Sequence, residues 1–155
     1  MDLQFDYKGD PIGGVITNYL LEKSRVVFQG KDERTFHIFY QLLRSADQER
    51  MSKLGLSNNP QDYRYTSQSG CDTVKSIDDK VDYKEVLTAM KTVGFEPHTI
   101  DAIYDMVGGI LHLGNIEFDG SGESSTVKEN GGAISSFLFS SRIFFRGATK
   151  GKSNN

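Results

Sequence analysis

The most regular hydrophobic pattern of the 155-residue chain lies in its second half. Apolar side chains recur there at the three- and four-residue spacing that places them on one face of a helix. The members of this stripe are Ile100, Ile103, Tyr104, Val107, Ile110 and Leu111. Pro97 suits the first turn of such a helix, and Gly114 with Asn115 suits its end. Gly108 and Gly109 interrupt it at a cost of about 1 kcal/mol per residue relative to alanine, which predicts close packing against another element.

Two shorter helices are predicted in the first half of the chain. One begins after Lys31 or Asp32, and its apolar positions at helical spacing are Phe36, Phe39, Tyr40 and Leu43. His37 lies in this helix and is interpreted as a packing or hydrogen-bonding residue, because no second His or Cys stands at the spacing of metal ligands. The other helix covers residues 48–54 and ends at Gly55.

A longer helix is predicted to begin within residues 76–79, with Asp78 or Asp79 as its N-cap. Its expected inner face consists of Val86, Leu87, Met90 and Val93. Gly94 is expected to end it in the left-handed conformation, and Phe95 to fold back on it. The adjacent carboxylates are therefore interpreted as helix caps and not as a catalytic pair.

A strand hairpin is predicted at the start of the chain. Residues 1–7 alternate apolar and polar side chains, as in a half-buried strand, and residues 8–11 carry a turn signal. Residues 12–21 are again extended in character, and the positions expected to be buried are Val15, Ile16, Tyr19 and Leu20. Residues 116–118 are a further short strand, whereas residues 58–72 and 120–132 have the composition of loops. The predicted class is α+β, predominantly α-helical with a few short strands.

One stretch departs from this pattern of apolar faces. Glu22, Lys23, Ser24 and Arg25 interrupt an apolar run with charges and a hydroxyl. Charges inside such a run are costly to bury unless they are paired. We therefore expect the stretch at an edge, a cleft or an interface, with partners elsewhere, including outside this chain.

The composition excludes some classes of function. A net charge of −3 argues against a general nucleic-acid or anionic-membrane binder. The single cysteine, Cys71, permits no internal disulfide, is interpreted as a loop thiol and points to a reducing compartment. No signal pattern opens the chain, and no apolar run approaches the length of a membrane span. Residues 147–153 imitate a phosphate-binding loop, but only three residues separate their glycines and the motif needs four.

Four stretches, in this order, resemble the motor head of a myosin: residues 1–14, 18–26, 33–43 and 110–118. The sequence of the first stretch, residues 1–14, most resembles that of class I myosins, in particular an Id-like group. The resemblance implies that residues 1–118 are a partial motor domain following switch I, in the upper half of the actin-binding region of a larger α/β P-loop fold. Residues 119–134 would be a loop of weak resemblance, and residues 135–155 a divergent tail that we expect to be disordered.

The resemblance also implies partners for the intact parent motor. These are Mg-ATP, actin filaments and calmodulin-type light chains, in the cytoplasm at the actin cytoskeleton or cell cortex. A membrane would be contacted only through a separate tail, and nucleic acid is not expected. Tyr19 and Leu20 would line an apolar pocket in the cleft wall, while Glu22, Lys23 and Arg25 would help to couple cleft closure to nucleotide state. None of them would be catalytic.

Residues 1–155 alone are expected to be inactive as an ATPase. The family's phosphate-binding loop and switch I would precede Met1, and Gly94–Glu96 copies only the second half of switch II. Lys91 and Thr92 stand where that motif requires Asp and Ile. An incomplete gene model or an alternative transcript would explain such a piece. The alternative function is a truncated, non-catalytic interaction module that pairs through the strand at residues 1–7.

Overall fold

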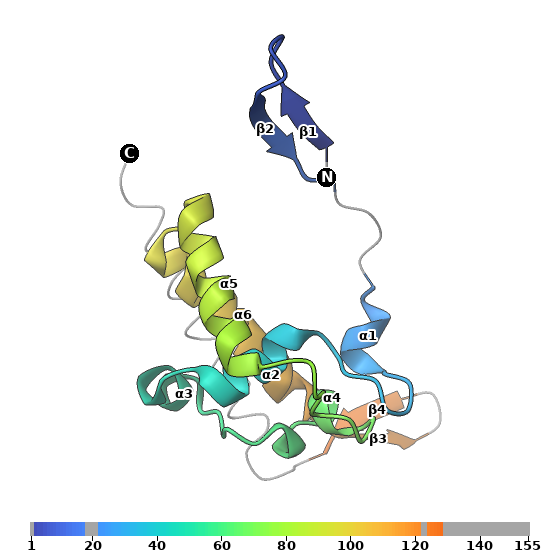
Figure 1. Cartoon of the computed structure of the whole chain (residues 1–155). Helices are drawn as coiled ribbons and strands as arrows, with labels where there is room; N and C mark the ends of the chain where they lie inside the picture. Colours follow the sequence, from blue (N-terminus) through green and yellow to red (C-terminus); the bar gives the residue numbers. More distant parts are fainter. Residues whose placement is uncertain (1, 18–21, 122–123, 129–155) are drawn as a thin grey trace, which may run out of the picture.

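The computed structural model describes residues 2–17, 22–121 and 124–128, in which a helical body is flanked by two small hairpins (Figure 1). The elements in chain order are β1 (Asp2–Phe5), β2 (Pro11–Val15), α1 (Ser24–Val27), α2 (His37–Ser45), α3 (Gln48–Leu54), the 3₁₀ turn η1 (Pro60–Asp62), α4 (Arg64–Ser67), α5 (Asp79–Val93), α6 (Pro97–Gly114), β3 (Phe118–Ser121) and β4 (Ser124–Val127). The predicted α+β class with mostly helical content is confirmed for these residues. No helix among them is long and apolar enough to cross a lipid bilayer.

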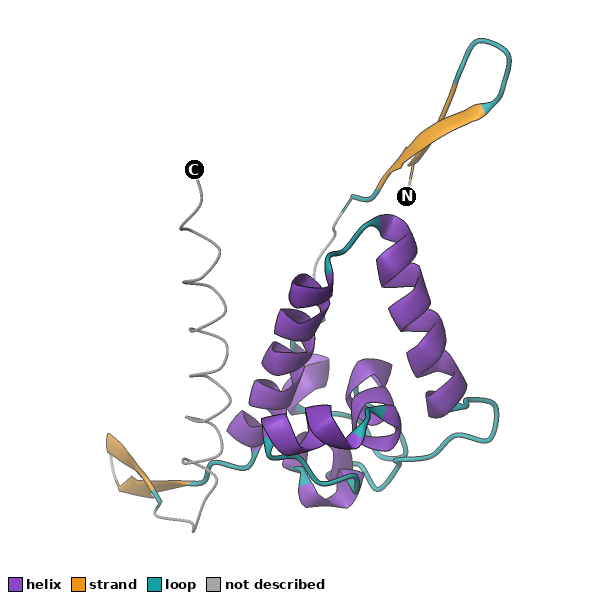
Figure 2. Ribbon diagram, turned by 90° about the vertical axis from the view of Figure 1, so that its left-hand side faces the viewer, coloured by secondary structure: helices purple, strands orange, loops and turns teal. Residues whose placement is uncertain are grey.

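The hydrophobic core lies where α2 packs against α5 and α6. α2 buries nearly its whole inner surface, including Phe39, Leu42 and Leu43. The stripe predicted for α6 supplies the facing side, with Tyr104 and Leu111 fully buried. Figure 2 shows α5 and α6 diverging from the turn that joins them, with the shorter helices packed between their far ends.

The helix ends follow the capping chemistry of the sequence. The Asp78 carboxylate accepts hydrogen bonds from the backbone N–H groups of Lys80 and Val81, at 2.9 and 3.2 Å, so Asp78 is the N-cap of α5 and Asp79 is not. Gly94 ends α5 with φ at 97°, and the Phe95 N–H donates to the Met90 carbonyl at 3.0 Å. The predicted bounds of α3 and its end at Gly55 are confirmed.

The predicted start of α2 is wrong. The helix begins at His37, and residues 33–36 before it are not helical. Asp32 has a positive φ of 64°, which turns the chain away from a helix. The physical reason lies in Arg34 and Thr35, which are both buried and make contacts outside α2.

Two expectations of burial are also wrong. Val93 is 78% exposed, because the described elements cover mainly the first turns of α5; Val86, Leu87 and Met90 are half-buried. The β1–β2 hairpin forms as predicted, with Asp2 opposite Val15. All residues of both strands are nevertheless exposed, Val15 included, and so is Ile16 after β2, since no described element covers either face.

Two segments assigned to loops contain secondary structure. Residues 58–72 include η1 and α4, and Tyr63 is buried there while Tyr65 is half-buried. The third strand begins at Phe118 and continues into a second hairpin, β3–β4, within residues predicted as loop. Asn115, just after α6, accepts a hydrogen bond from the Arg64 N–H at 2.8 Å and so ties the helix end to α4.

The close packing predicted for Gly108 and Gly109 in α6 is found at Gly108 and not at Gly109. A Cβ atom at Gly108 would lie 3.2 Å from the Leu54 side chain, whereas at Gly109 it would meet no described atom within 4 Å. At Gly114 it would lie 2.7 Å from the ring of Tyr65, a separation that forces the ring or the helix to move.

We expect Gly114→Ala to destabilise the protein by about 1–3 kcal/mol, the usual cost of overpacking. In a Tyr65→Ala background the same change should be neutral or stabilising, because alanine favours the helix and the ring is gone. Urea unfolding of the four proteins of this double-mutant cycle measures the coupling. Equal effects of Gly114→Ala in both backgrounds would show that the contact with the Tyr65 ring is not what disfavours a larger side chain at position 114.

A second prediction concerns Tyr104, whose hydroxyl is buried without a hydrogen-bond partner among the described residues. Burial raises its pKa to about 12. The neutral ring therefore contributes stability that is complete below about pH 10, the usual tyrosine pKa, and is lost as pH rises toward 12.

Tyr104→Phe should consequently leave the free energy of unfolding unchanged or raised at pH 7, and should flatten its fall above pH 10. Tyr40→Phe is the matched control, since the Tyr40 hydroxyl donates to the Thr66 carbonyl at 3.3 Å. Its loss should cost about 1 kcal/mol. Chemical denaturation at several pH values tests both; a larger loss from Tyr104→Phe at pH 7 would contradict the assignment.

Candidate functional site

Within the charged stretch, residues 22–25, two side chains form an ion pair with each other. The Arg25 guanidinium donates to both carboxylate oxygens of Glu22, at 2.8 and 3.0 Å, and its Nη1 also lies 3.3 Å from Glu33. These hydrogen bonds lower the pKa of the Glu22 carboxyl below its ordinary value. The cluster is solvent-exposed, so its ion pairs contribute little to stability and can be exchanged for others.

The main chain of this region is held much more firmly than its side chains. The Arg25 carbonyl accepts hydrogen bonds from the Thr35 hydroxyl at 2.9 Å and from the Gln29 amide at 2.6 Å. The Gln68 amide donates to the Val27 carbonyl at 2.8 Å. Val26 packs against the hydrophobic core. α1 is therefore anchored to the helical body, while its charges remain free to change partners.

The five residues predicted for the cleft wall have different outcomes. Glu22 and Arg25 are brought together, and Arg25 also pairs with Glu33 of the same chain. Lys23 precedes the first turn of α1 and makes no ion pair with any described residue. Tyr19 and Leu20 lie outside the described residues. The coupling role of all five stays a prediction.

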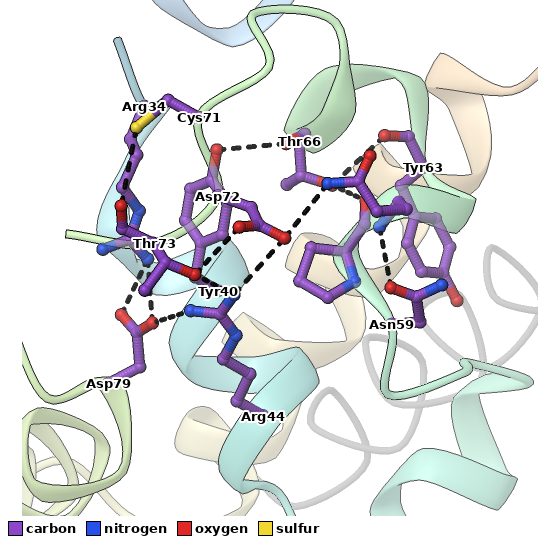
Figure 3. Close-up of polar contacts among 12 residues, drawn as sticks. Arg34, Tyr40, Arg44, Asn59, Tyr63, Thr66, Cys71, Asp72, Thr73 and Asp79 are labelled. Atoms are coloured by element: carbon purple, nitrogen blue, oxygen red, sulfur yellow. Dashed lines mark hydrogen bonds and ion pairs between the residues drawn. The ribbon is translucent and has the colours of Figure 1, made fainter. Parts of the chain in front are cut away.

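A second, buried cluster is formed by Arg34, Arg44 and Asp79 (Figure 3). Arg34 Nη2 contacts both oxygens of Asp79, at 2.8 and 2.9 Å, and both side chains are almost fully buried. Arg44 of α2 reaches the same carboxylate at 2.7 Å and also donates to the Thr73 hydroxyl. The Ser45 hydroxyl donates to the Asp79 carbonyl at 3.1 Å. Two cations thus fix the start of α5 against α2.

The ring of Tyr40 packs against the guanidinium of Arg34 in this buried cluster. The Arg34 guanidinium stacks on its ring, with Cζ 3.8 Å from the ring centre, a favourable cation–π geometry. The Tyr40 hydroxyl receives the Thr35 N–H at 3.4 Å and donates to the Thr66 carbonyl. Burial raises the pKa of Tyr40, so the hydroxyl stays protonated and available as a donor.

Residues 33–35 join the two clusters. Glu33 contacts Arg25 at the surface, Arg34 contacts Asp79 in the interior, and Thr35 holds the Arg25 carbonyl. The sequence interpretation missed this segment because it assigned residues 33–35 to a helix. One signal was available: of two adjacent aspartates at a helix start only one can serve as the N-cap, which leaves Asp79 for another partner.

An open groove of about 670 Å³ runs beside this segment. Its walls combine charged side chains with apolar ones, and the lining residues are Glu22, Arg25, Arg34, Thr35, Phe36, His37, Ile38, Gln41 and Val86. Within α2, His37 is exposed at the first turn. The charged stretch therefore borders a surface depression and not a closed chamber.

Among the described residues, no group of three or more His, Cys, Asp or Glu side chains is arranged to hold a metal ion. Gly94, Phe95 and Glu96, which imitate half of switch II, form the turn from α5 to α6. Residues 147–153 lie outside the described residues.

Comparison with known proteins adds the family. A family model described as the myosin head (motor domain) matches residues 1–139. Unconventional myosin-Ic from Gallus gallus is 47% identical over 132 residues, which cover 84% of this chain and 13% of that protein. Unconventional myosin-Ic-A from Xenopus laevis is 51% identical over 118 residues, covering 76% and 12%. Unconventional myosin-Ih from Homo sapiens is 49% identical over 119 residues, covering 77% and 12%.

The chain belongs to the myosin head (motor domain) family. Its relatives are class I unconventional myosins, as the motif wording predicted, and the chain spans 12–13% of the length of those relatives. The Id-like grouping and the boundaries at residues 118 and 134 stay predictions.

We expect Asp79→Asn to lower the free energy of unfolding by about 3 kcal/mol or more, because it leaves Arg34 charged, buried and unpaired. The double variant Arg34→Met, Asp79→Leu should recover much of this loss, since an apolar pair carries no uncompensated charge. Glu22→Gln, at the exposed pair, is the control and should change stability much less. Urea denaturation ranks the variants, and similar losses for Asp79→Asn and Glu22→Gln would contradict the ranking.

Proposed function

We propose that this chain contributes part of the actin-binding region of a class I myosin motor, a protein that moves on actin filaments by hydrolysing ATP. The match to the myosin head family and the 47–51% identity to class I relatives support this. In this proposal Mg-ATP, actin and calmodulin-type light chains belong to the whole motor, which works in the cytoplasm on the actin cytoskeleton.

Within that motor, we assign to the charged stretch the coupling of cleft closure to nucleotide state. The carrying observation is the 33–35 segment, which ties exposed, exchangeable ion pairs to a buried and rigid cluster. A switch needs an element that can change partners and a body that moves as a unit with it. A shift of α1 would pull on Thr35 and reach α2 and α5 through Arg34 and Asp79.

A chimera tests the proposal. Residues 1–118 replace the aligned segment of Gallus gallus unconventional myosin-Ic, and actin-activated ATPase and filament gliding are measured. The chimera should retain actin-activated turnover. Thr35→Val in the chimera removes the hydroxyl that holds Arg25 and should weaken actin activation by about tenfold, since coupling free energies are typically 1–3 kcal/mol. Basal ATPase should change little.

Thr88→Val is the matched control, because Thr88 also donates to a backbone carbonyl, that of Lys84 at 2.9 Å, but on the outer face of α5. A chimera without actin-activated turnover would refute the motor assignment. An active chimera in which Thr35→Val and Thr88→Val behave alike would refute only the coupling role.

A second candidate function is the interaction module. The observation that favours it is the exposed β1–β2 hairpin, in which Leu3, Phe5 and Ile12 are each more than half exposed. Such a hairpin can accept a further strand along an open edge. A pull-down of residues 1–155 with the remainder of a class I motor domain tests this function, and loss of capture by Leu3→Lys, Phe5→Lys would support it. No capture by the unmodified chain would exclude it.

A further inference from the structure

The groove of about 670 Å³ beside the charged stretch is lined by two buried polar side chains, Arg34 and Gln41, that keep unused hydrogen-bonding groups. It lies between the start of α2 and the middle of α5, since Gln41 of α2 and Val86 of α5 both line it. Buried polar groups in proteins are normally hydrogen-bonded, so each exception calls for an explanation. Arg34 and Gln41 therefore point to a ligand that completes their hydrogen bonds.

The Arg34 guanidinium is only partly satisfied. Its side chain is 3% exposed and its Nη2 donates to Asp79, but Nε and Nη1 have no hydrogen-bond partner. Stacking on the Tyr40 ring does not supply one, because the ring covers the flat side of the guanidinium and the N–H groups lie in its plane. Arg44, the other cation on Asp79, also lies 3.5 Å from the Asp72 carboxylate. Arg34 has no second carboxylate within the described part of the chain.

The Gln41 amide is the second unused group. Gln41 is 5% exposed, although the other buried side chains of α2 are aromatic or aliphatic. Its amide makes no hydrogen bond with a described residue, and it lines the groove. An amide offers both N–H donors and a carbonyl acceptor. A main-chain peptide unit offers the complementary pair, so a segment of extended polypeptide satisfies both sides of this amide.

The remaining walls of the groove indicate which side chains such a segment carries. Phe36, Ile38 and Val86 supply apolar surface. Arg34 offers donors and no acceptor, and the strongest hydrogen bonds of a guanidinium are those with a carboxylate. Ligand sites in proteins combine apolar walls with a few such polar groups, and their volumes of about 300–1,000 Å³ include that of this groove.

We propose that the groove binds an extended peptide segment from outside residues 1–155, with an acidic side chain next to an apolar one. The carboxylate accepts a hydrogen bond from an unpartnered N–H group of Arg34. The main chain of the segment pairs with the Gln41 amide, and its apolar side chain lies against Ile38 and Val86.

The charged stretch shares this groove with Arg34. The Glu22 and Arg25 side chains line it and are 56% and 32% exposed. An exposed ion pair contributes little free energy, so these side chains move aside for the segment at little cost. The Arg25 main chain stays in place, because the Thr35 hydroxyl donates to its carbonyl at 2.9 Å. Binding of the segment requires neither ATP nor actin, and it can therefore be tested separately from the motor function.

An NMR titration of residues 1–155 tests the proposal. The probe is the blocked dipeptide acetyl-Asp-Leu-amide, and the matched neutral probe is acetyl-Asn-Leu-amide. The aspartyl probe should shift the backbone amides of Thr35 and Ile38 and the side-chain amide of Gln41 in a saturable way. It should bind about threefold tighter than the asparaginyl probe or more, because hydrogen bonds to a charged acceptor are stronger. Succinate, which has no peptide unit, should bind more weakly than the aspartyl probe by about the same factor.

A glutamine variant tests the contact with the main chain of the segment. Gln41→Met removes the amide and keeps the length of the side chain, so the chain should fold as before. Its affinity for the aspartyl probe should fall about threefold or more. Gln48→Met is the matched control, since the exposed Gln48 amide donates to the Ser52 hydroxyl at 3.2 Å on α3, away from the groove. This control should bind the probe like the unmodified chain.

Each part of the proposal has an outcome that overturns it. Equal affinities for the two dipeptides would exclude the carboxylate contact with Arg34. Unchanged binding by Gln41→Met, or succinate binding as tight as that of the aspartyl probe, would exclude recognition of a peptide. Shifts confined to residues outside the groove would exclude the site itself. The motor assignment is decided by the activity of the chimera and by none of these results.

Discussion

The structure depends on one buried carboxylate. Asp79 begins α5 and receives Arg34 from the segment before α2 and Arg44 from α2 itself. An ion pair this deeply buried gains little net stability, since desolvation offsets the attraction, but removing either partner leaves an uncompensated buried charge. The carboxylate thereby fixes the start of α5 against α2 and the segment that precedes α2, which lie 35 and 45 residues earlier in the sequence. It also explains why residues 33–36 stay out of the helix: a helical start would carry Arg34 away from Asp79.

The same arrangement separates a buried ion-pair cluster from one at the surface. Arg34 stacks on Tyr40 and pairs with Asp79 in the interior, whereas the Glu22, Arg25 and Glu33 side chains form their ion pairs at the surface. The burial of an ion pair matters here, because exposed ion pairs change partners at little cost in free energy whereas buried ion pairs do not. Residues 33–35 join the two clusters, because Glu33 contacts Arg25 at the surface and Arg34 contacts Asp79 in the interior.

Local chemistry made much of the fold predictable. Asp78, Gly55 and Gly94 cap their helices because a side-chain oxygen or a left-handed glycine satisfies terminal backbone groups whatever the tertiary context. The apolar stripe of α6 was equally readable. Burial was harder to predict. Val93, Val15 and Ile16 are apolar, as core residues usually are, but no described element covers them. Hydrophobic periodicity identifies the apolar face of a helix or strand, but it does not identify the element that packs against that face.

The sequence by itself therefore determined the helices α3, α5 and α6, the glycines that end α3 and α5, the first hairpin and, through its motifs, the myosin family. Tertiary structure alone decided where α2 begins, that Asp79 is an ion-pair partner and not a cap, and that Glu22 and Arg25 satisfy one another. The physical reason is distance along the chain. Caps and helical faces are set by residues within a few positions, whereas the partner of Arg34 lies 45 residues away, and no local pattern specifies it.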